Sequence, residues 1–191
     1  PDSEFIIAED GSNDNTREIL KSIKNKYNLT FDFCDERRGY VGAVKSIYNR
    51  ASGDIVFFLD SDGEHDPSDF WKLYEKFNEG YDIVVGYKTN RKPLYRLFIS
   101  RINNFLVGLL FGIWFKDANC GFRIMRKPIK DFVAQSNILK SAFNVEMLVL
   151  AKRANKKMAQ VPVRHIQVPS VVFSATNMPI TIIKSLKELY V

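Results

Sequence analysis

The sequence contains few of the residues that build disulfide frameworks or zinc sites. Its 191 residues include two cysteines, Cys34 and Cys120, and two histidines, His65 and His165. Two cysteines without a CxxC pair form no disulfide framework, and this set of side chains argues against a structural zinc site. Cysteine usage of this kind is typical of a protein in a reducing compartment.

Long apolar runs are also lacking. The longest, FLVGLLFGIWF at 105–115, has roughly half of the about 20 residues that a membrane-spanning helix needs. This run predicts a core helix or an interfacial helix, and we expect core packing for most of its side chains. Upstream of it, Arg91, Lys92, Arg96 and Arg101 alternate with apolar and aromatic residues, a combination that suits a membrane surface.

Positive charge is scarce in one half of the chain and negative charge in the other. Residues 1–85 carry 10 Lys/Arg and 18 Asp/Glu, a net charge of −8, whereas residues 86–191 carry 18 and 4, a net charge of +14. An acidic half beside a basic half favours a cation on one side and an anionic partner on the other. That partner is phosphate, nucleic acid or an anionic membrane; the plainer alternative is a solvated basic face.

The apolar pattern changes its period several times along the chain. In chain order it predicts a strand at 4–9, a helix at 15–27, a strand at 29–34, a helix at 40–51, strands at 55–60 and 82–87 with a helix from Pro67 to near Gly80 between them, a helix at 93–113, a strand at 121–126, a short helix, a helix at 143–154 and a strand at 159–166. Strands that alternate with helices predict an α/β fold with a mostly parallel, doubly wound sheet. We expect one domain over 1–191 and an amphipathic, membrane-proximal helix over 178–191.

Acidic and polar residues gather where apolar strands end, the edge at which open parallel sheets bind ligands. VFFL at 56–59 runs into Asp60, Ser61, Asp62, Gly63 and Glu64, which is either an acidic loop or a site for Mg²⁺ or Mn²⁺. Glu9 to Asp14 follows the first strand, as a capped turn or as a loop that contacts a nucleotide. Lys88 follows the fourth strand, where an ammonium group suits a phosphate.

Five segments in order resemble the family 2 glycosyltransferases of the GT-A fold. EDGSNDNT at 9–16 resembles the family pattern DDGSxDxT, and LDSDGEHDP at 59–67 resembles DADGQHDP. RRGYVGAVKSIYNRASGDIV at 37–56, DANCGFRIMRK at 117–127 and FNVEMLVLAKRANKKMAQVPVRH at 143–165 resemble three later motifs. The subgroup that the chain resembles is the polyprenyl-phosphate and dolichyl-phosphate sugar transferases.

The resemblance implies a metal-dependent hexosyltransferase, with roles for particular residues. The donor would be a UDP- or GDP-sugar bound by Asp10, Gly11, Ser12, Asp60 and Ser61. The metal ligands for Mg²⁺ or Mn²⁺ would be Asp60, Asp62 and Glu64. The acceptor phosphate would bind Lys88, Arg96 and Ser100. Arg123 lies within an otherwise apolar strand, which predicts either a structural cation or one that also binds the acceptor phosphate. Asp62 would be a catalytic carboxylate. Asp117 would be the second, serving as a base only if the acceptor were a hydroxyl; its alternative role is that of a turn residue that bonds backbone amides.

The basic half and the apolar run at 105–115 predict where the protein works, and the resemblance shows where the sequence departs from the family pattern. We expect a peripheral protein on the cytoplasmic face of an anionic membrane, with a polyprenyl-phosphate acceptor, sugar transfer with inversion and no nucleic-acid partner. Glu64 and Lys88 stand where the subgroup has Gln and Arg. The family's opening strand with its PxYNE motif is expected before residue 1, and the RxxGxS motif that should follow VPVRH is not found at 168–173.

Two other functions remain open at this point. A degenerate transferase would bind a nucleotide-sugar without turnover and act as a partner subunit. LDSDG also satisfies the opening motif of haloacid-dehalogenase-like phosphatases, in which Asp60 would be the nucleophile. That motif normally lies near the start of the chain, and it leaves the EDGS turn unexplained.

Overall fold

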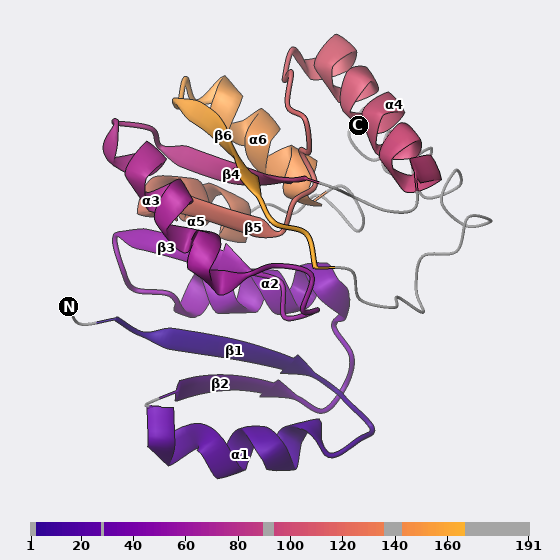
Figure 1. Ribbon diagram of the computed structural model, residues 1–191. Helices are drawn as coiled ribbons and strands as arrows, with labels where there is room; N and C mark the ends of the chain where they lie inside the picture. Colours follow the sequence, from indigo (N-terminus) through magenta and orange to yellow (C-terminus); the bar gives the residue numbers. More distant parts are fainter. Residues whose placement is uncertain (1–2, 28, 90–93, 136–142, 167–191) are drawn as a thin grey trace.

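The computed structural model describes residues 3–27, 29–89, 94–135 and 143–166. In this part of the chain the strands form two sheets (Figure 1). The smaller sheet pairs β1 (Phe5–Asp10) in parallel with β2 (Leu29–Cys34). Helix α1 (Thr16–Tyr27) connects the two strands and packs against β2. The three elements form a β–α–β unit, in which the helix supplies the crossover that parallel strands need.

The larger sheet has the strand order β3-β5-β4-β6. These strands are β3 (Ile55–Leu59), β5 (Phe122–Arg126), β4 (Ile83–Lys88) and β6 (Met158–Val163). β4 and β6 are parallel, whereas β5 runs antiparallel to both of its neighbours. The structure confirms the α/β class; it differs from one continuous sheet because β1 and β3 share no ladder of hydrogen bonds among the described residues.

Helices cover both faces of the larger sheet. The segment η1 (Pro67–Asp69) leads into α3 (Phe70–Asn78), which packs against β4, β5 and β6. Helices α2 (Gly39–Arg50), α5 (Lys127–Gln135) and α6 (Phe143–Arg153) pack in series, α5 between the other two and against β3 and β5. Helix α4 (Leu94–Phe111) lies apart from this layer (Figure 1). Each helix and strand lies within a few residues of its predicted position.

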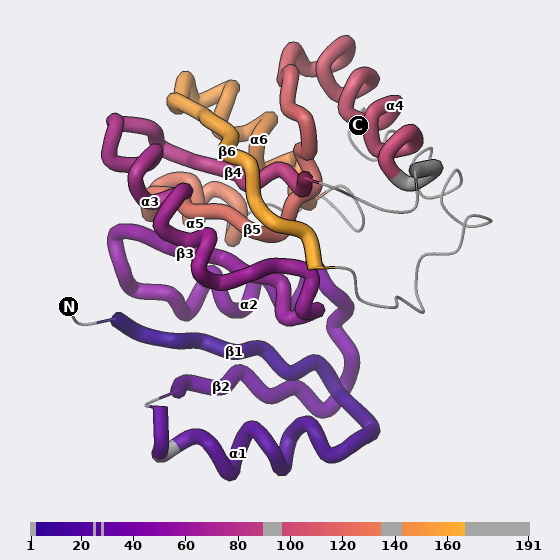
Figure 2. Tube along the Cα trace, in the orientation of Figure 1, coloured from indigo at the N-terminus to yellow at the C-terminus, as the bar shows by residue number. Residues whose placement is uncertain are grey.

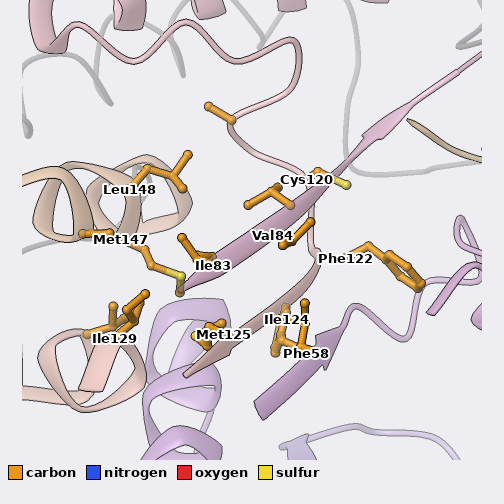
Figure 3. Packing of buried hydrophobic residues seen from close by; sticks show 14 of the residues in the cluster. Phe58, Ile83, Val84, Cys120, Phe122, Ile124, Met125, Ile129, Met147 and Leu148 are labelled. Carbon is orange, nitrogen blue, oxygen red and sulfur yellow. The ribbon is translucent and has the colours of Figure 1, made fainter. Parts of the chain in front are cut away.

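The core lies between the larger sheet and these helices (Figure 3). Strand residues such as Ile83, Val84 and Ile124 meet helix residues such as Met147 and Leu148, and all five are completely buried. Burial of the strand on both faces explains why β4 begins as an apolar run, Ile83 to Val85. In the described part of the chain, no helix is long and apolar enough to cross a membrane. The 178–191 helix lies outside the described residues.

Candidate active site

Two loops meet at one edge of the larger sheet. β3 and β4 end at this edge, and antiparallel β5 begins there, so residues 117–121 lie beside residues 60–64. The Asp60 amide donates to the Gly121 carbonyl at 3.0 Å, which continues the β3–β5 pairing. The Ile166 amide donates to the Glu64 carbonyl at 2.9 Å, so the end of β6 holds the other side of the loop (Figure 2).

Asp60 occupies the tightest place in this arrangement. Its Oδ1 accepts a hydrogen bond of 3.0 Å from the Tyr40 hydroxyl. A Cβ on Gly121 would overlap Asp60 Oδ2, so only glycine leaves room for this carboxylate. Burial raises the pKa of Asp60, and the charge of Asp62 raises it further against the opposing effects of Tyr40 and Arg123. A bound cation would relieve both causes.

Asp62 and Glu64 take different directions. Asp62 is exposed, and its Oδ1 accepts from the Glu64 amide at 2.9 Å, a local turn bond. The Glu64 carboxylate pairs with the Lys88 ammonium instead, and His165 Nε2 lies 3.6 Å from Glu64 Oε2. Among the described residues, no three His, Cys, Asp or Glu side chains converge as a metal site. The expected convergence of the Asp60, Asp62 and Glu64 carboxylates is therefore not present in the described part of the structure, because Glu64 forms an ion pair with Lys88.

Asp60 and Asp62 nevertheless suit a hard cation. They lie two positions apart at the sheet edge, and the charge of Asp62 contributes to the raised pKa of Asp60. Mg²⁺ is typically held by one or two carboxylates together with substrate phosphates, so two protein ligands are enough. The donor set fits Mg²⁺ or Mn²⁺ when a nucleoside diphosphate supplies further oxygens. Ser61, between the two, is exposed.

The acidic turn after β1 is satisfied from within the protein. Glu9 is buried; it accepts from the Ser12 amide, and its Oε2 lies 2.7 Å from Arg17 Nη2. The backbone bond from Ser12 lowers the pKa of Glu9, and Arg17 contributes in the same direction despite burial. Gly11 has a φ of +68°, and a Cβ at this position would lie 3.1 Å from the Asp35 carbonyl oxygen and from the Arg37 side chain. Any other residue would therefore be strained at this position.

Asp10 holds the beginning of α2. Its carboxylate accepts from the amides of Arg38 and Gly39, both at 2.8 Å. The Asp10 side chain remains 22% exposed, which leaves one edge open to a ligand. Contact of Asp10, Gly11 or Ser12 with a nucleotide stays a prediction.

The residues predicted to bind the acceptor phosphate fall into different environments. Lys88 lies at the end of β4, facing Glu64. Ser100, on α4, accepts from Asn104 Nδ2 at 3.3 Å, and Asn104 is itself tied to the Lys116 carbonyl. The Arg96 side chain lies outside the described part of the structure.

Arg123 requires a correction. It is completely buried as the second residue of β5, where it donates to the Cys120 carbonyl and its Nη1 lies 3.5 Å from the Met147 sulfur. A guanidinium in this place does not face an incoming lipid phosphate. Its charge instead lowers the pKa of Asp60 against burial. Asp117 is 7% exposed, so as a base it would have little access to an acceptor hydroxyl.

Sequence reasoning missed two residues that shape this site, Tyr40 and Gly121. Both lie inside motifs that were recognised, RRGYVG and DANCGFR, but neither has a spacing that assigns it a partner. The Tyr40–Asp60 bond joins the start of α2 to the end of β3, and the Gly121–Asp60 contact joins β5 to the same point. Only the folded chain brings them together.

Comparison with known families identifies the chain. The family model "Glycosyl transferase family 2" matches residues 1–132. The chain belongs to this family. Among its curated relatives are the undecaprenyl-phosphate 4-deoxy-4-formamido-L-arabinose transferases of Salmonella paratyphi B and Salmonella newport. Each is 26% identical over 165 residues, a match that covers 85% of this chain and 49% of the relative. The chain thus spans about half the length of these relatives.

Solved structures agree on the fold. The structure is similar to glucosyl-3-phosphoglycerate synthase from Mycobacterium tuberculosis in complex with UDP, with a TM-score of 0.74 and 16% identity over 96% of this chain and 66% of that one. The same enzyme with Mn²⁺, UDP and glucosyl-3-phosphoglycerate gives 0.73 and 16%, over 97% and 67%. The likeness establishes the GT-A fold and agrees with the resemblance found in the motifs.

Proposed function

We propose that this chain is the catalytic domain of an inverting glycosyltransferase that moves a sugar from a UDP- or GDP-sugar to polyprenyl phosphate. One observation carries the proposal: in a family 2 chain, the Asp60 carboxylate lies at the ligand-binding edge of the sheet, where it accepts from the Tyr40 hydroxyl, fits only because residue 121 is glycine, and has Asp62 two positions away. The undecaprenyl-phosphate transferases among its relatives support the acceptor. The Mn²⁺ and UDP bound by its structural neighbour support the donor and the metal.

The chemistry is a single displacement. An ionised oxygen of the acceptor phosphate attacks the anomeric carbon as the bond to the nucleoside diphosphate breaks, which inverts the configuration. Asp60 and Asp62 would hold Mg²⁺ or Mn²⁺, which when bound neutralises charge on the departing diphosphate. Because such an acceptor is already ionised, it needs no general base, in keeping with the burial of Asp117. Lys88, Arg96 and Ser100 would receive the acceptor phosphate.

Helix α4 provides a surface for the membrane that holds such an acceptor. Its outward residues Phe98, Ile102, Phe105 and Leu109 follow a helical spacing and are 64%, 43%, 59% and 65% exposed. Trp114 extends this apolar stripe, since its ring contacts that of Phe105 at a centroid distance of 6.1 Å. Exposed apolar residues that form a contiguous patch mark a binding surface, unlike the scattered ones found on most proteins.

Charge favours a bilayer as the occupant of this stripe. Arg101 is exposed on the same helix, and Lys116 follows it near Tyr87. Each basic residue close to an anionic leaflet adds about 1 kcal/mol of attraction, and the aromatic rings supply interfacial contacts. We therefore place the protein on the cytoplasmic leaflet of an anionic membrane, with α4 toward the lipid. The basic residues of 91–92 and 178–191 lie outside the described part.

Vesicle co-sedimentation tests the docking surface. Phe98→Ser combined with Phe105→Ser should reduce binding to phosphatidylglycerol vesicles by more than about tenfold, because each buried phenyl group contributes about 1.5–3 kcal/mol. Trp71→Ser, on α3 and 62% exposed, is the matched control and should bind normally. Equal binding by the stripe variant and the control would remove α4 from the interface.

A turnover assay with the full-length protein tests the activity. UDP- and GDP-sugars are offered with Mn²⁺ and polyprenyl phosphate in vesicles, and the glycolipid is identified by mass spectrometry. Asp62→Asn should abolish the product, whereas Asp54→Asn, an exposed aspartate at the other end of β3, should not. Nucleotide binding without any product would indicate the non-catalytic subunit. Release of phosphate from a phosphomonoester would indicate the phosphatase.

A further inference from the structure

Residues assigned from sequence to two different subsites are joined by one ion pair. Glu64 was expected beside the metal and Lys88 beside the acceptor phosphate, yet the Lys88 ammonium pairs with the Glu64 carboxylate. The pair is largely shielded from water, with side chains only 10% and 16% exposed for Lys88 and Glu64. A shielded ion pair is not easily broken without replacement partners for both charges.

The backbone holds both partners at the junction between the subsites. Lys88 is the last residue of β4, paired with Val163 of β6. The Glu64 amide donates to Asp62 Oδ1, and its carbonyl accepts from the Ile166 amide at 2.9 Å. Glu64 is therefore two residues from a predicted metal ligand, while its carboxylate is directed at a predicted phosphate ligand.

We propose that Glu64 and Lys88 exchange partners when the substrates bind, and that this exchange couples the donor subsite to the acceptor subsite. The inference rests on the function proposed above. In the ligand-free protein the two charges neutralise each other. With both subsites filled, Lys88 turns to the acceptor phosphate and Glu64 to the cation beside Asp60 and Asp62.

The exchange predicts positive cooperativity. A phosphate that draws Lys88 away removes the positive charge that neutralises the Glu64 carboxylate in the ion pair, which favours a cation. A cation that draws Glu64 away leaves the Lys88 ammonium available to phosphate. Each ligand must strengthen the other by the same factor, because coupling of binding free energies is reciprocal. Coupling of this kind typically amounts to a factor of about 5–150. In the enzyme it would favour the complex that holds both substrates.

Mn²⁺ binding measured by electron paramagnetic resonance tests the exchange without relying on turnover. The full-length protein with UDP is titrated with Mn²⁺ alone, with inorganic phosphate, and with a short-chain isoprenyl phosphate, to separate free phosphate from a lipid head group. We expect either phosphate to tighten Mn²⁺ binding at least about fivefold in the wild type.

Variants assign the coupling to the pair. Lys88→Met, which keeps length without charge, should bind Mn²⁺ more tightly than the wild type in the absence of phosphate and should no longer respond to phosphate. Glu64→Gln should lose the response as well. The double variant Glu64→Gln with Lys88→Met removes both charges together and covers the case in which a single variant fails to fold. Lys76→Met is the control, because Lys76 forms an exposed pair with Glu79 on α3.

The results separate this proposal from the function itself. Mn²⁺ bound with UDP but insensitive to both phosphates in the wild type would overturn the exchange and leave the transferase intact. A response to phosphate that survives in Glu64→Gln and in the double variant would also overturn it. Absence of Mn²⁺ binding in the wild type would overturn the exchange and the metal-dependent mechanism together, and the turnover assay would then decide between transferase and binding subunit.

Discussion

Glu9 at the end of β1 and Asp60 after β3 are carboxylates in similar acidic turns, yet their pKa values shift in opposite directions. Glu9 accepts a hydrogen bond from the Ser12 backbone amide and pairs with the Arg17 guanidinium. Together these interactions outweigh the effect of burial and lower the pKa of Glu9. Asp60 receives a phenol hydroxyl, and burial raises its pKa. The protein therefore stabilises the Glu9 anion with its own groups, whereas the Asp60 anion would be stabilised by a bound cation.

This contrast separates an acidic turn that serves the fold from one that serves chemistry. A carboxylate with partners inside the protein contributes to stability, so its removal lowers the free energy of unfolding. A partly buried carboxylate beside a second one is a liability to the empty protein, and it persists where a ligand compensates.

The largest effect is expected at Asp60. Asp60→Asn keeps the size and the bond from Tyr40 but removes the charge, so turnover and Mn²⁺ binding should fall by at least about a hundredfold. The free energy of unfolding without metal should stay the same or rise, because the variant no longer buries an anion next to Asp62. Urea unfolding and an activity assay test both. A variant that is destabilised yet active would make Asp60 a structural residue like Glu9.

Gly121→Ala should act on the same carboxylate from the other side. The added Cβ would overlap Asp60 Oδ2, so the carboxylate must move and Mn²⁺ binding should weaken by more than about tenfold. Gly53→Ala is the matched control at the opposite end of β3, where a Cβ meets only the Ile55 carbonyl at 3.4 Å. Titration of both variants with Mn²⁺ decides. Unchanged binding in Gly121→Ala would show that the metal does not depend on this position of Asp60.

Glu9 should give the reverse result, with stability affected and chemistry spared. Glu9→Gln leaves the Arg17 guanidinium without its buried anion and should lower the free energy of unfolding by about 2 kcal/mol. Asp35→Asn is the control, because Asp35 pairs with the same guanidinium but its side chain is 91% exposed. Urea unfolding should show no change for this variant. A catalytic defect in Glu9→Gln at full stability would assign Glu9 to the substrate instead.

The difference between wild type and Glu9→Gln should depend on pH in a definite direction. The folded-state pKa of Glu9 lies below its ordinary value of 4.5, so its stabilisation is complete above that value and is lost as the pH falls through the folded pKa. The free energies of unfolding of the two proteins should differ at about pH 7, and the difference should shrink steadily as the pH is lowered below 4.5. A difference that does not shrink below pH 4.5 would mean that the anion is not what stabilises the turn.

The positions of the elements and of the acidic turns could be predicted from sequence because their signals are local. An apolar run such as Val56 to Leu59 indicates a strand by itself, and Asp60 to Glu64 follow it directly. The strand ends then share an edge because of the topology of the fold. Local signals were enough to find the loops.

Which charges meet could not be predicted, because those contacts join distant segments. Glu64 pairs with Lys88 on another strand, and Tyr40 reaches Asp60 from the start of α2. Arg123 lies in an apolar strand, and its sequence left a structural or a phosphate-facing role open. Its burial within β5 became evident only with the neighbouring strands in place. The antiparallel direction of β5 likewise depends on its partners.

The smallest effect is expected at Tyr40, and it measures how far Asp60 is stabilised without a ligand. Tyr40→Phe removes the hydroxyl that donates to Asp60 Oδ1 at 3.0 Å and keeps the ring. Loss of one such bond costs about 1 kcal/mol, which corresponds to about a fivefold weaker orientation of the carboxylate toward the metal. Turnover should fall by that factor at low Mn²⁺ and recover at saturating Mn²⁺, because excess cation supplies the missing compensation. Tyr27→Phe, an exposed tyrosine on α1, should behave as the wild type. A deficit that saturating Mn²⁺ does not reduce would place the Tyr40 hydroxyl on the substrate itself, and the contrast between the two turns would then need a third partner for Asp60.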